Sequence, residues 1–438
     1  MIPPPDSSLP PSARHLEVPG EAVLRGEPVT IRVRGLAPSR RVTLAAVGRD
    51  QFGGTWSSRA DLVADGGGVI DLSRDAPVAG SWAGAGSEGP FRSMALDPAA
   101  AVVTPMVSID AVDLRLLDAG GVELDRARVR FTVRVGVREV LAGGRIRGSL
   151  FLPEGAPPRR AVVVLGGSEG GCRLELAAQL ASRLRVPALA LACFGVPGSG
   201  LPAALERIPL EYLASALDWL EARPEVRAGP QVLLGVSRGA ELALLVAATW
   251  PDRIRAVAAS VPSAVAWAGQ GPDPGAPAWT LGGSPVPFLP VRMTAEQGER
   301  LERAMREGTP FPFREVHAAS IAAATGAEVA AATLPVERIG GPLLLIGSDD
   351  DGVWPSGDFV ARIAARLAAS GFAHPVTALA YPGAGHLLQD GYQPTTLTHT
   401  VVPGSPLVLD LGGTPEGTAA ANADSWPRLL RFLEGALG

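Results

Sequence analysis

A serine inside a glycine-bounded turn is the residue of this chain whose setting points most clearly to chemistry. Residues 235–239 read Gly-Val-Ser-Arg-Gly and match G-x-S-x-G, with Ser237 at the centre. This pattern is typical of a sharp turn between a strand and a helix that exposes a serine hydroxyl as a nucleophile. An apolar run at 230–234 and a helix-forming run at 240–247 supply that strand and that helix. The alternative is a serine that only caps the following helix.

His386 is the histidine whose position suits a base for this serine, because a serine nucleophile needs a group that takes its proton. It ends the glycine-rich stretch Tyr381-Pro-Gly-Ala-Gly-His386, which follows the strand-like run 376–381. Four other histidines lack a comparable setting: His15, His317, His374 and His399. We expect His386 to reach Ser237 from its loop; the alternative is a histidine on a surface loop.

Three adjacent aspartates could supply the carboxylate that orients such a histidine. Asp349, Asp350 and Asp351 follow the apolar run 343–346, where a carboxylate would stand at the carboxyl edge of a sheet. The order serine, acid, histidine is that of α/β-hydrolases. The distance from the start of the loop favours Asp350, whereas the distance back from Trp354-Pro-Ser356 favours Asp351. The residues alone therefore leave the choice between the two open.

Backbone N–H groups near the serine could bind the oxyanion of an acyl-transfer intermediate. One should come from Arg238, directly after the nucleophile, and a second from the loop 167–169, for which we choose Ser168. The alternative for the run Gly-Gly-Ser-Glu-Gly-Gly at 166–171 is a phosphate cradle. Nucleotide binding is disfavoured, because the run matches neither G-x-G-x-x-G nor a Walker loop and the chain has no lysine.

The composition is that of an ordinary globular protein. The 438 residues are 47% hydrophobic and 19% charged, and a net charge of −5 gives no electrostatic reason to bind nucleic acid or an anionic membrane. All 39 basic residues are arginine, which excludes a Schiff-base lysine. The bias towards arginine, alanine, glycine and proline indicates a GC-rich bacterial genome.

Cysteine, leader and membrane signals point to a cytoplasmic protein. The two cysteines, Cys172 and Cys193, can form neither a disulfide framework nor a zinc cluster, and we expect both to be buried thiols. The N-terminal residues lack the apolar stretch of a secretory signal, and no run approaches the ~20 apolar residues that span a bilayer. We expect no cofactor and no metal, and the oligomeric state stays open.

Two regions of different texture predict two domains. Residues 1–14 are rich in proline and serine and predict a disordered tail. Residues 15–138 contain short alternating runs bounded by glycine and proline turns, which predict an all-β, immunoglobulin-like sandwich without a convincing helix. The clearest of these runs are 29–34, 41–47, 113–118 and 128–135.

Residues 139–438 alternate strand-like and helix-like runs, which predicts a doubly wound parallel sheet. The expected strands include 161–165, 186–192, 341–346 and 376–381, and the expected helices include 174–184, 210–221, 358–369 and 425–437. The regularity fails at about 262–334, and an insertion of this length predicts a lid over an active site. The expected fold class is therefore α/β, an α/β-hydrolase with an N-terminal sandwich domain.

Several of these stretches together resemble the family of acyl-CoA thioesterases and bile acid-CoA:amino acid N-acyltransferases, over nearly the whole chain. The matching stretches are Gly35-Leu-Ala-Pro38, Gly80-Ser-Trp82, Phe91-Arg-Ser-Met94, Gly166-Gly-Ser-Glu-Gly-Gly171, Phe194-Gly-Val-Pro-Gly198, Gly235-Val-Ser-Arg-Gly239, Pro335-Val-Glu-Arg-Ile339, Asp350-Asp-Gly-Val-Trp-Pro-Ser356, Tyr381-Pro-Gly-Ala-Gly-His386, Gly412-Gly-Thr414 and Asp424-Ser-Trp426. The resemblance implies that the acid is the second aspartate of a pair before Trp-x-Ser, which is Asp351. This chain departs from the pattern with a third aspartate and a longer, proline-rich segment at 269–290.

The resemblance implies a serine hydrolase that cleaves an acyl thioester such as an acyl-CoA, a small-molecule substrate. Ser237 would be the nucleophile, His386 the base and Asp351 the residue that orients it. Family members with a cysteine nucleophile tend to be transferases, so Ser237 favours water over an amine or alcohol as acceptor. An ester or lactone hydrolase of a biosynthetic pathway is a further alternative, as is a binding protein with a vestigial triad.

Overall fold

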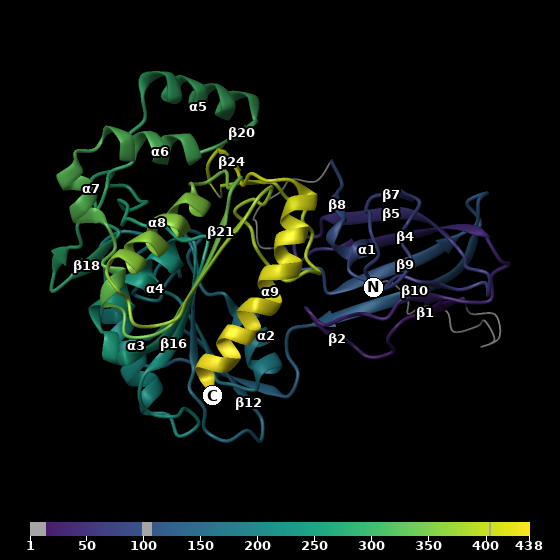
Figure 1. The fold of residues 1–438 in the computed structure, drawn as a ribbon, viewed down its shortest axis with the longest axis horizontal. Helices are drawn as coiled ribbons and strands as arrows, with labels where there is room; N and C mark the ends of the chain where they lie inside the picture. Colours follow the sequence, from purple (N-terminus) through teal and green to yellow (C-terminus); the bar gives the residue numbers. More distant parts are fainter. Residues whose placement is uncertain (1–14, 99–106, 403) are drawn as a thin grey trace. The chain divides into compact units, whose positions relative to one another are not determined.

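The computed structural model describes residues 15–98, 107–402 and 404–438, so the predicted tail 1–14 lies outside the described residues. The described chain divides into two compact units (Figure 1). The first unit holds residues up to Thr132 together with Gln389–Leu397, and the second holds Val133–Leu388 and Thr398–Gly438. The first unit is therefore discontinuous in sequence, and nothing in the sequence pattern separated 389–397 from its neighbours.

The first unit is built from two sheets of mostly short strands. The larger sheet has the order β2-β10-β9-β4-β5-β7, with β8 paired to β5, and the smaller sheet has the order β1-β3-β6. The strand bounds are β1 Leu16–Glu17, β2 Val23–Leu24, β3 Arg32–Val33, β4 Arg41–Arg49, β5 Thr55–Val63, β6 Ile70–Asp71, β7 Ala79–Gly80, β8 Ala95–Leu96, β9 Ala111–Leu117 and β10 Glu123–Thr132. Every second side chain of β5 is buried from Trp56 to Leu62, so one face of this sheet lines a core. One turn of helix, α1 (Gly89–Arg92), interrupts the β structure.

The segment Gln389–Leu397 completes the core of the first unit. The ring of Tyr392 lies 5.7 Å from that of Phe91 and 5.8 Å from that of Phe131, measured between centroids. The Tyr392 hydroxyl accepts a hydrogen bond of 3.0 Å from the backbone N–H of Val29. A tyrosine ring that packs among other aromatic rings while its hydroxyl is hydrogen-bonded contributes substantially to the stability of a small core.

The second unit contains an eight-stranded sheet with the order β11-β12-β14-β13-β16-β17-β21-β22. Its strands are β11 Val137–Leu141, β12 Gly148–Pro153, β13 Val162–Leu165, β14 Ala188–Leu191, β16 Gln231–Val236, β17 Ile254–Ser260, β21 Leu343–Ser348 and β22 Val376–Tyr381. β12 pairs antiparallel with both β11 and β14, and every later pairing is parallel. This doubly wound sheet, together with the β-rich first unit, confirms the predicted fold class.

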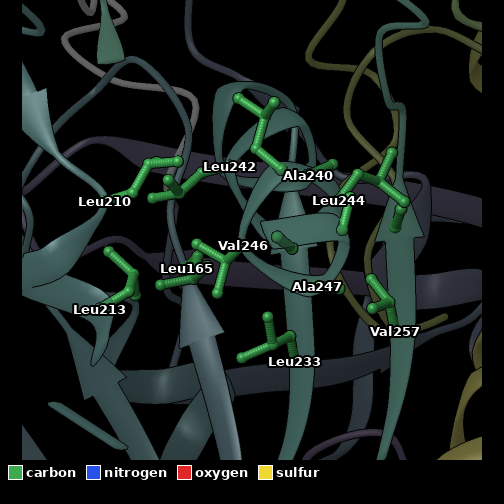
Figure 2. Packing of buried hydrophobic residues seen from close by; sticks show 14 of the residues in the cluster. Leu165, Leu210, Leu213, Leu233, Ala240, Leu242, Leu244, Val246, Ala247 and Val257 are labelled. Atoms are coloured by element: carbon green, nitrogen blue, oxygen red, sulfur yellow. The ribbon is translucent and has the colours of Figure 1, made fainter. Parts of the chain in front are cut away.

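Helices cover both faces of this sheet, as the continuous apolar strands require. They are α2 (Leu174–Leu184), α3 (Glu211–Glu221), α4 (Arg238–Thr249), α8 (Ser356–Ala369) and α9 (Pro415–Leu437). Successive side chains of β13 point to opposite faces of the sheet and enter two different hydrophobic clusters. Val163 and Leu165 share a cluster with α3, α4 and α8, whereas Val162 and Val164 share one with α2 and α9. Figure 2 shows α4 side chains among those of the strands beneath it.

The predicted helices 174–184 and 210–221 match α2 and α3 closely, and the strand 376–381 coincides with β22. The last helix begins ten residues earlier than predicted, at Pro415 instead of Ser425. Thr414 caps its start by accepting a hydrogen bond from the backbone N–H of Gly417. The prediction missed this first half because it carries few large apolar side chains. Pro427 also favours a start near residue 425, because proline is common in the first turn of a helix.

The predicted insertion at 262–334 contains three helices and short strands. These elements are β18 (Trp279–Leu281), β19 (Ser284–Pro285), α5 (Ala295–Glu307), β20 (Pro310–Phe311), α6 (Arg314–Ala323) and α7 (Gly326–Ala332). β18 joins β15 (Ile208–Pro209), and β20 joins β24 (Val408–Asp410), which also pairs with β23 (His399–Val401). Two 3-10 turns complete the unit, η2 (Pro251–Arg253) and η3 (Val336–Arg338). No helix in the described part of the chain is long and apolar enough to cross a membrane.

Candidate active site

Ser237 occupies the turn between β16 and α4, as its motif predicts. Its backbone φ of 56° lies in the left-handed region, which few non-glycine residues adopt. A Cβ on Gly235 would collide with the backbone of Gly239, and a Cβ on Gly239 would collide with the backbone of Leu165 and Gly166. The two motif glycines are therefore required by close backbone approach. The Ser237 side chain makes no capping hydrogen bond to α4, so the capping alternative does not hold.

Ser237, His386 and Asp351 form one chain of hydrogen bonds. The Nε2 atom of His386 lies 3.0 Å from Oγ of Ser237, and its Nδ1 atom lies 2.8 Å from Oδ2 of Asp351. The Asp351 side chain is completely buried, while Ser237 keeps 8% and the His386 side chain 12% of their surface exposed. The carboxylate is therefore fully shielded from solvent, whereas Ser237 and His386 each keep a small exposed fraction.

Asp351 is surrounded by hydrogen-bond donors that suit an ionised carboxylate. Its Oδ1 accepts from the backbone N–H groups of Val353 (2.9 Å) and Trp354 (3.2 Å). Its Oδ2 accepts from the Ser356 hydroxyl (2.6 Å) and faces Nδ1 of His386. A carboxylate in this setting holds the Nδ1 proton and leaves Nε2 free to accept the serine proton. The Ser356 contact explains why a serine stands two residues after the tryptophan.

The three neighbouring aspartates have different surroundings. Asp351 is the one that meets His386, while Asp350 accepts a hydrogen bond of 2.7 Å from the backbone N–H of Gly383. Gly383 lies in the loop that carries His386, so the Asp350 side chain braces the histidine loop. Asp349 is exposed.

The predicted oxyanion donors come from two segments near Ser237. Arg238 is the first residue of α4, and the N–H groups at a helix start have no acceptor within the helix. On the other side Gly167 approaches the serine: a Cβ built there would lie 3.2 Å from the Cβ of Ser237. The assignment of the second donor to Ser168 stays a prediction.

A buried ion pair begins at Arg238, the residue that follows Ser237. Nη1 of Arg238 is 3.3 Å from Oε2 of Glu241, and both side chains are at least 98% buried. Nη2 of Arg238 donates to the carbonyls of Trp267 and Ala268, and Oε1 of Glu241 accepts from Nε1 of Trp279 (2.6 Å). Burial raises the pKa of Glu241 and lowers that of Arg238, and each charge opposes the shift of the other. The pair ties the start of α4 to the insertion.

Trp354 joins the acid loop to the insertion. Its Nε1 donates to the carbonyl of Val261 (3.1 Å), a buried residue with a positive φ of 43°. Its ring lies edge-on to His386 and to His317, with centroid distances of 5.8 Å in both cases. Burial lowers the pKa of His317 to about 4, so this histidine is neutral in the folded protein near neutral pH. This packing could not be predicted, because His317 is a lone histidine with no motif around it.

The remaining candidate groups lie outside this arrangement. Both cysteines are free thiols; burial raises the pKa of Cys172 and raises that of Cys193 to about 12, which disfavours the reactive thiolate. His15 lies in the first unit, where its ring meets the carbonyl of Arg34. The described residues contain no group of three or more side chains that could hold a metal ion.

Comparison with known proteins covers both units. The family described as "Acyl-CoA thioester hydrolase/BAAT N-terminal region" matches residues 26–137, and "BAAT / Acyl-CoA thioester hydrolase C terminal" matches residues 208–438. Acyl-coenzyme A thioesterase 1 of Homo sapiens is 32% identical over 436 residues, with 94% of each chain covered. Acyl-coenzyme A thioesterase 6 of Mus musculus is 33% identical, with 93% of each chain covered.

Solved structures give weaker matches. A dienelactone hydrolase-like promiscuous phosphotriesterase from metagenomic libraries is 15% identical, with a TM-score of 0.41 over 69% of this chain and 98% of that one. An esterase of Pyrobaculum calidifontis is 16% identical, with a TM-score of 0.36 over 68% of this chain and 85% of that one.

The doubly wound sheet with Ser237 at its elbow and His386 and Asp351 beside it defines an enzyme of the α/β-hydrolase class. The family matches and the identity over 94% of the chain define its relatives more narrowly. The chain belongs to the acyl-CoA thioester hydrolase/BAAT family, and the resemblance inferred from its motifs is confirmed.

Proposed function

We propose that this enzyme hydrolyses an acyl thioester, an acyl-CoA, through an acyl-enzyme on Ser237. The observation that carries the proposal is the hydrogen-bonded chain from Ser237 through His386 to Asp351 in a member of this family. The relatives named above are acyl-coenzyme A thioesterases. The match extends beyond the α/β-hydrolase part, because the N-terminal region of the family matches residues 26–137.

The first half of the reaction acylates the serine. Nε2 of His386 takes the hydroxyl proton while Oγ of Ser237 forms a bond to the thioester carbonyl carbon. The carbonyl oxygen becomes an oxyanion, which the N–H of Arg238 and a donor from the 167–169 loop would hold. When the intermediate collapses, the carbon–sulfur bond breaks, and the thiolate receives the proton from Nε2 as free CoA thiol.

The second half returns the enzyme to its starting state. Nε2 of His386 takes a proton from water, whose oxygen attacks the acyl-serine carbonyl carbon. Collapse of the second intermediate breaks the bond to Oγ, and the proton on Nε2 returns to Ser237. Asp351 stays ionised throughout and stabilises the imidazolium formed in each half.

We further propose that the insertion at about 262–334 is a lid, and that residues 15–138 and 139–438 are the two functional domains. Support for the lid comes from α6, where the Arg314 side chain donates to the carbonyl of Asp349 (2.6 Å) and its backbone N–H donates to that of Gly352 (2.9 Å). A movement of α6 would therefore reach the acid loop. A bacterial source, inferred from the composition, and a cytoplasmic location stay predictions.

The test incubates the full chain with acyl-CoAs of increasing chain length, with and without amine or alcohol acceptors, and identifies the products by mass. We expect the wild-type enzyme to release free acid and CoA in equal amounts. The Ser237→Ala variant should release neither. Amide or ester as the main product would make the enzyme a transferase, and turnover of oxygen esters alone would make it an esterase or lactonase. Binding without any turnover would indicate a vestigial site.

A further inference from the structure

Residues Leu411–Gly413, called the clasp below, lie between the loop of Asp351 and the loop of His386. The carbonyl oxygen of Leu411 accepts two hydrogen bonds, one from the N–H of Gly352 (3.1 Å) and one from the N–H of His386 (2.7 Å). Gly352 follows the acid directly, so a single oxygen holds the backbone next to the acid and the backbone of the base. On the far side of the clasp, the N–H of Gly413 donates to the carbonyl of Asp350 (2.9 Å).

Both clasp glycines are required by their backbone conformation and by lack of space. Gly412 has a φ of 73° and Gly413 a φ of 70°, values that side-chain-bearing residues rarely adopt. A Cβ on Gly412 would collide with the backbone of Asp350 and Gly352, on the acid side. A Cβ on Gly413 would collide with the backbone of Ala384 and Gly385, on the base side. Each glycine therefore faces one loop at backbone contact.

The clasp itself is held at both ends. Before it, β24 pairs with β20 and β23; after it, Thr414 caps the start of α9. The N–H of Thr414 also donates to the carbonyl of Gly383 (2.8 Å), and the hydroxyl of Thr418 accepts from the N–H of Gly385 (3.2 Å). The histidine loop is thus docked on the clasp and on the first turn of a 23-residue helix.

We propose that the clasp is a positioning element, and that Gly412 and Gly413 are the residues that set the separation of Asp351 and His386. This inference rests on the proposed function of the same site. The Asp351–His386 hydrogen bond is 2.8 Å long. An increase of less than about 1 Å in this distance is enough to break it. A methyl group wedged against either loop produces a displacement of that size. The two glycines act through the acid and the base and do not touch substrate.

The test compares Gly412→Ala and Gly413→Ala with Gly371→Ala. Gly371 also has a positive φ (66°), but a Cβ there meets nothing within 4 Å, so it controls for backbone strain alone. Folded sites are counted by titration with a fluorophosphonate, and kcat is expressed per titrated site. We expect about a 10²-fold loss of kcat for the two clasp variants, with KM changed less than about threefold, and no loss for Gly371→Ala.

A second background separates positioning from general damage. In Asp351→Asn the contact that the clasp protects is already lost, so Gly412→Ala should cost less than about threefold there. An equal loss in both backgrounds, or an unchanged kcat per titrated site, would overturn the proposal. The rate of fluorophosphonate labelling of Ser237 reports serine activation whatever the natural substrate is. The clasp therefore remains testable if acyl-CoA proves not to be the substrate, and the two failures can be distinguished.

Discussion

Ser237 and its two partners are held in place by different kinds of contact. The turn of Ser237 depends on Gly235 and Gly239, two residues to either side, and on the strand and helix that they join. Asp351 and His386 lie 35 residues apart in separate loops, and both loops rest on residues 411–413. Ser237 is positioned mainly by local sequence, whereas Asp351 and His386 are positioned by a segment that follows both of them by at least 25 residues.

This difference implies different responses to mutation. A local turn forms wherever its strand and helix form, so the elbow should tolerate changes elsewhere in the unit. The acid–base pair depends on several separate hydrogen bonds, so small changes in distant residues should weaken it without unfolding the protein. Four predictions test this contrast.

The largest effect is expected at the elbow. Ser237→Ala removes the nucleophile but leaves the turn, so kcat should fall by about 10⁴-fold or more while the melting temperature stays within a few degrees. Ser348→Ala is the matched control: it is fully buried, its hydroxyl has no hydrogen-bond partner among the described residues, and its activity should be unchanged. Residual activity of a few per cent in Ser237→Ala would exclude a serine mechanism.

The neighbouring aspartates should differ sharply. Asp351→Asn should lower kcat by about 10³- to 10⁴-fold, because an amide at this position favours the wrong histidine tautomer. Asp350→Asn keeps an acceptor near Gly383 and should cost less than about tenfold. Steady-state kinetics of both variants with one acyl-CoA decide the matter. The reverse order would transfer the orienting role to Asp350 and contradict the contact seen here.

The elbow side also contains the buried ion pair of Arg238 and Glu241. Glu241→Ala leaves Arg238 without its counter-charge in a buried site, so we expect the free energy of unfolding to fall by about 3–5 kcal/mol. The control is Glu315→Ala, which breaks the exposed pair with Arg300 and should cost at most about 1 kcal/mol. Denaturant unfolding measures both values. Equal losses would mean that the buried Arg238–Glu241 pair contributes no more to the free energy of unfolding than the exposed Arg300–Glu315 pair.

Acid should act on the loop side of the site through His317. Its pKa is lowered from 6.5 to about 4 by burial, so between these pH values the unfolded chain takes up a proton that the folded protein does not. The free energy of unfolding should therefore fall by up to about 3 kcal/mol as the pH drops from 6.5 to 4. His317→Gln should flatten this slope and His399→Gln, at an exposed position, should not. An unchanged slope in His317→Gln would assign the acid sensitivity to other groups.

The same contrast explains what could be predicted from the sequence. The elbow could be predicted because strand, turn and helix signals are contiguous from 230 to 247. His386 could be proposed from its glycine-rich loop, whereas the choice between Asp350 and Asp351 depended on the family resemblance. The structure places these two carboxylates in different contacts, which no local pattern encodes.

The roles of other segments could not be predicted because they join distant residues. Gly412 and Gly413 of the clasp belong to a stretch that resembles the family, but the role of the clasp depends on loops that precede it by about 25 and 60 residues. The buried position of His317 depends on Trp267, near the start of the insertion, and on Trp354, in the acid loop beyond its end. The segment 389–397 carries no sequence signal that separates it from the second unit. Its place is revealed only by contacts of the folded chain, such as those of Tyr392 with Phe91 and Phe131.

The inserted segment Gln389–Leu397 has a consequence for biosynthesis on the ribosome. The Val29 N–H meets the Tyr392 hydroxyl across 363 residues of sequence, so the core of the first unit stays incomplete until most of the chain has been translated. At the usual 5–20 residues per second, about 15–50 s pass between the synthesis of Thr132 and that of Leu397. Throughout this interval the rings of Phe91 and Phe131, which contact each other edge-on, lack their contact with the ring of Tyr392. The aromatic core of the first unit is therefore completed only near the end of translation.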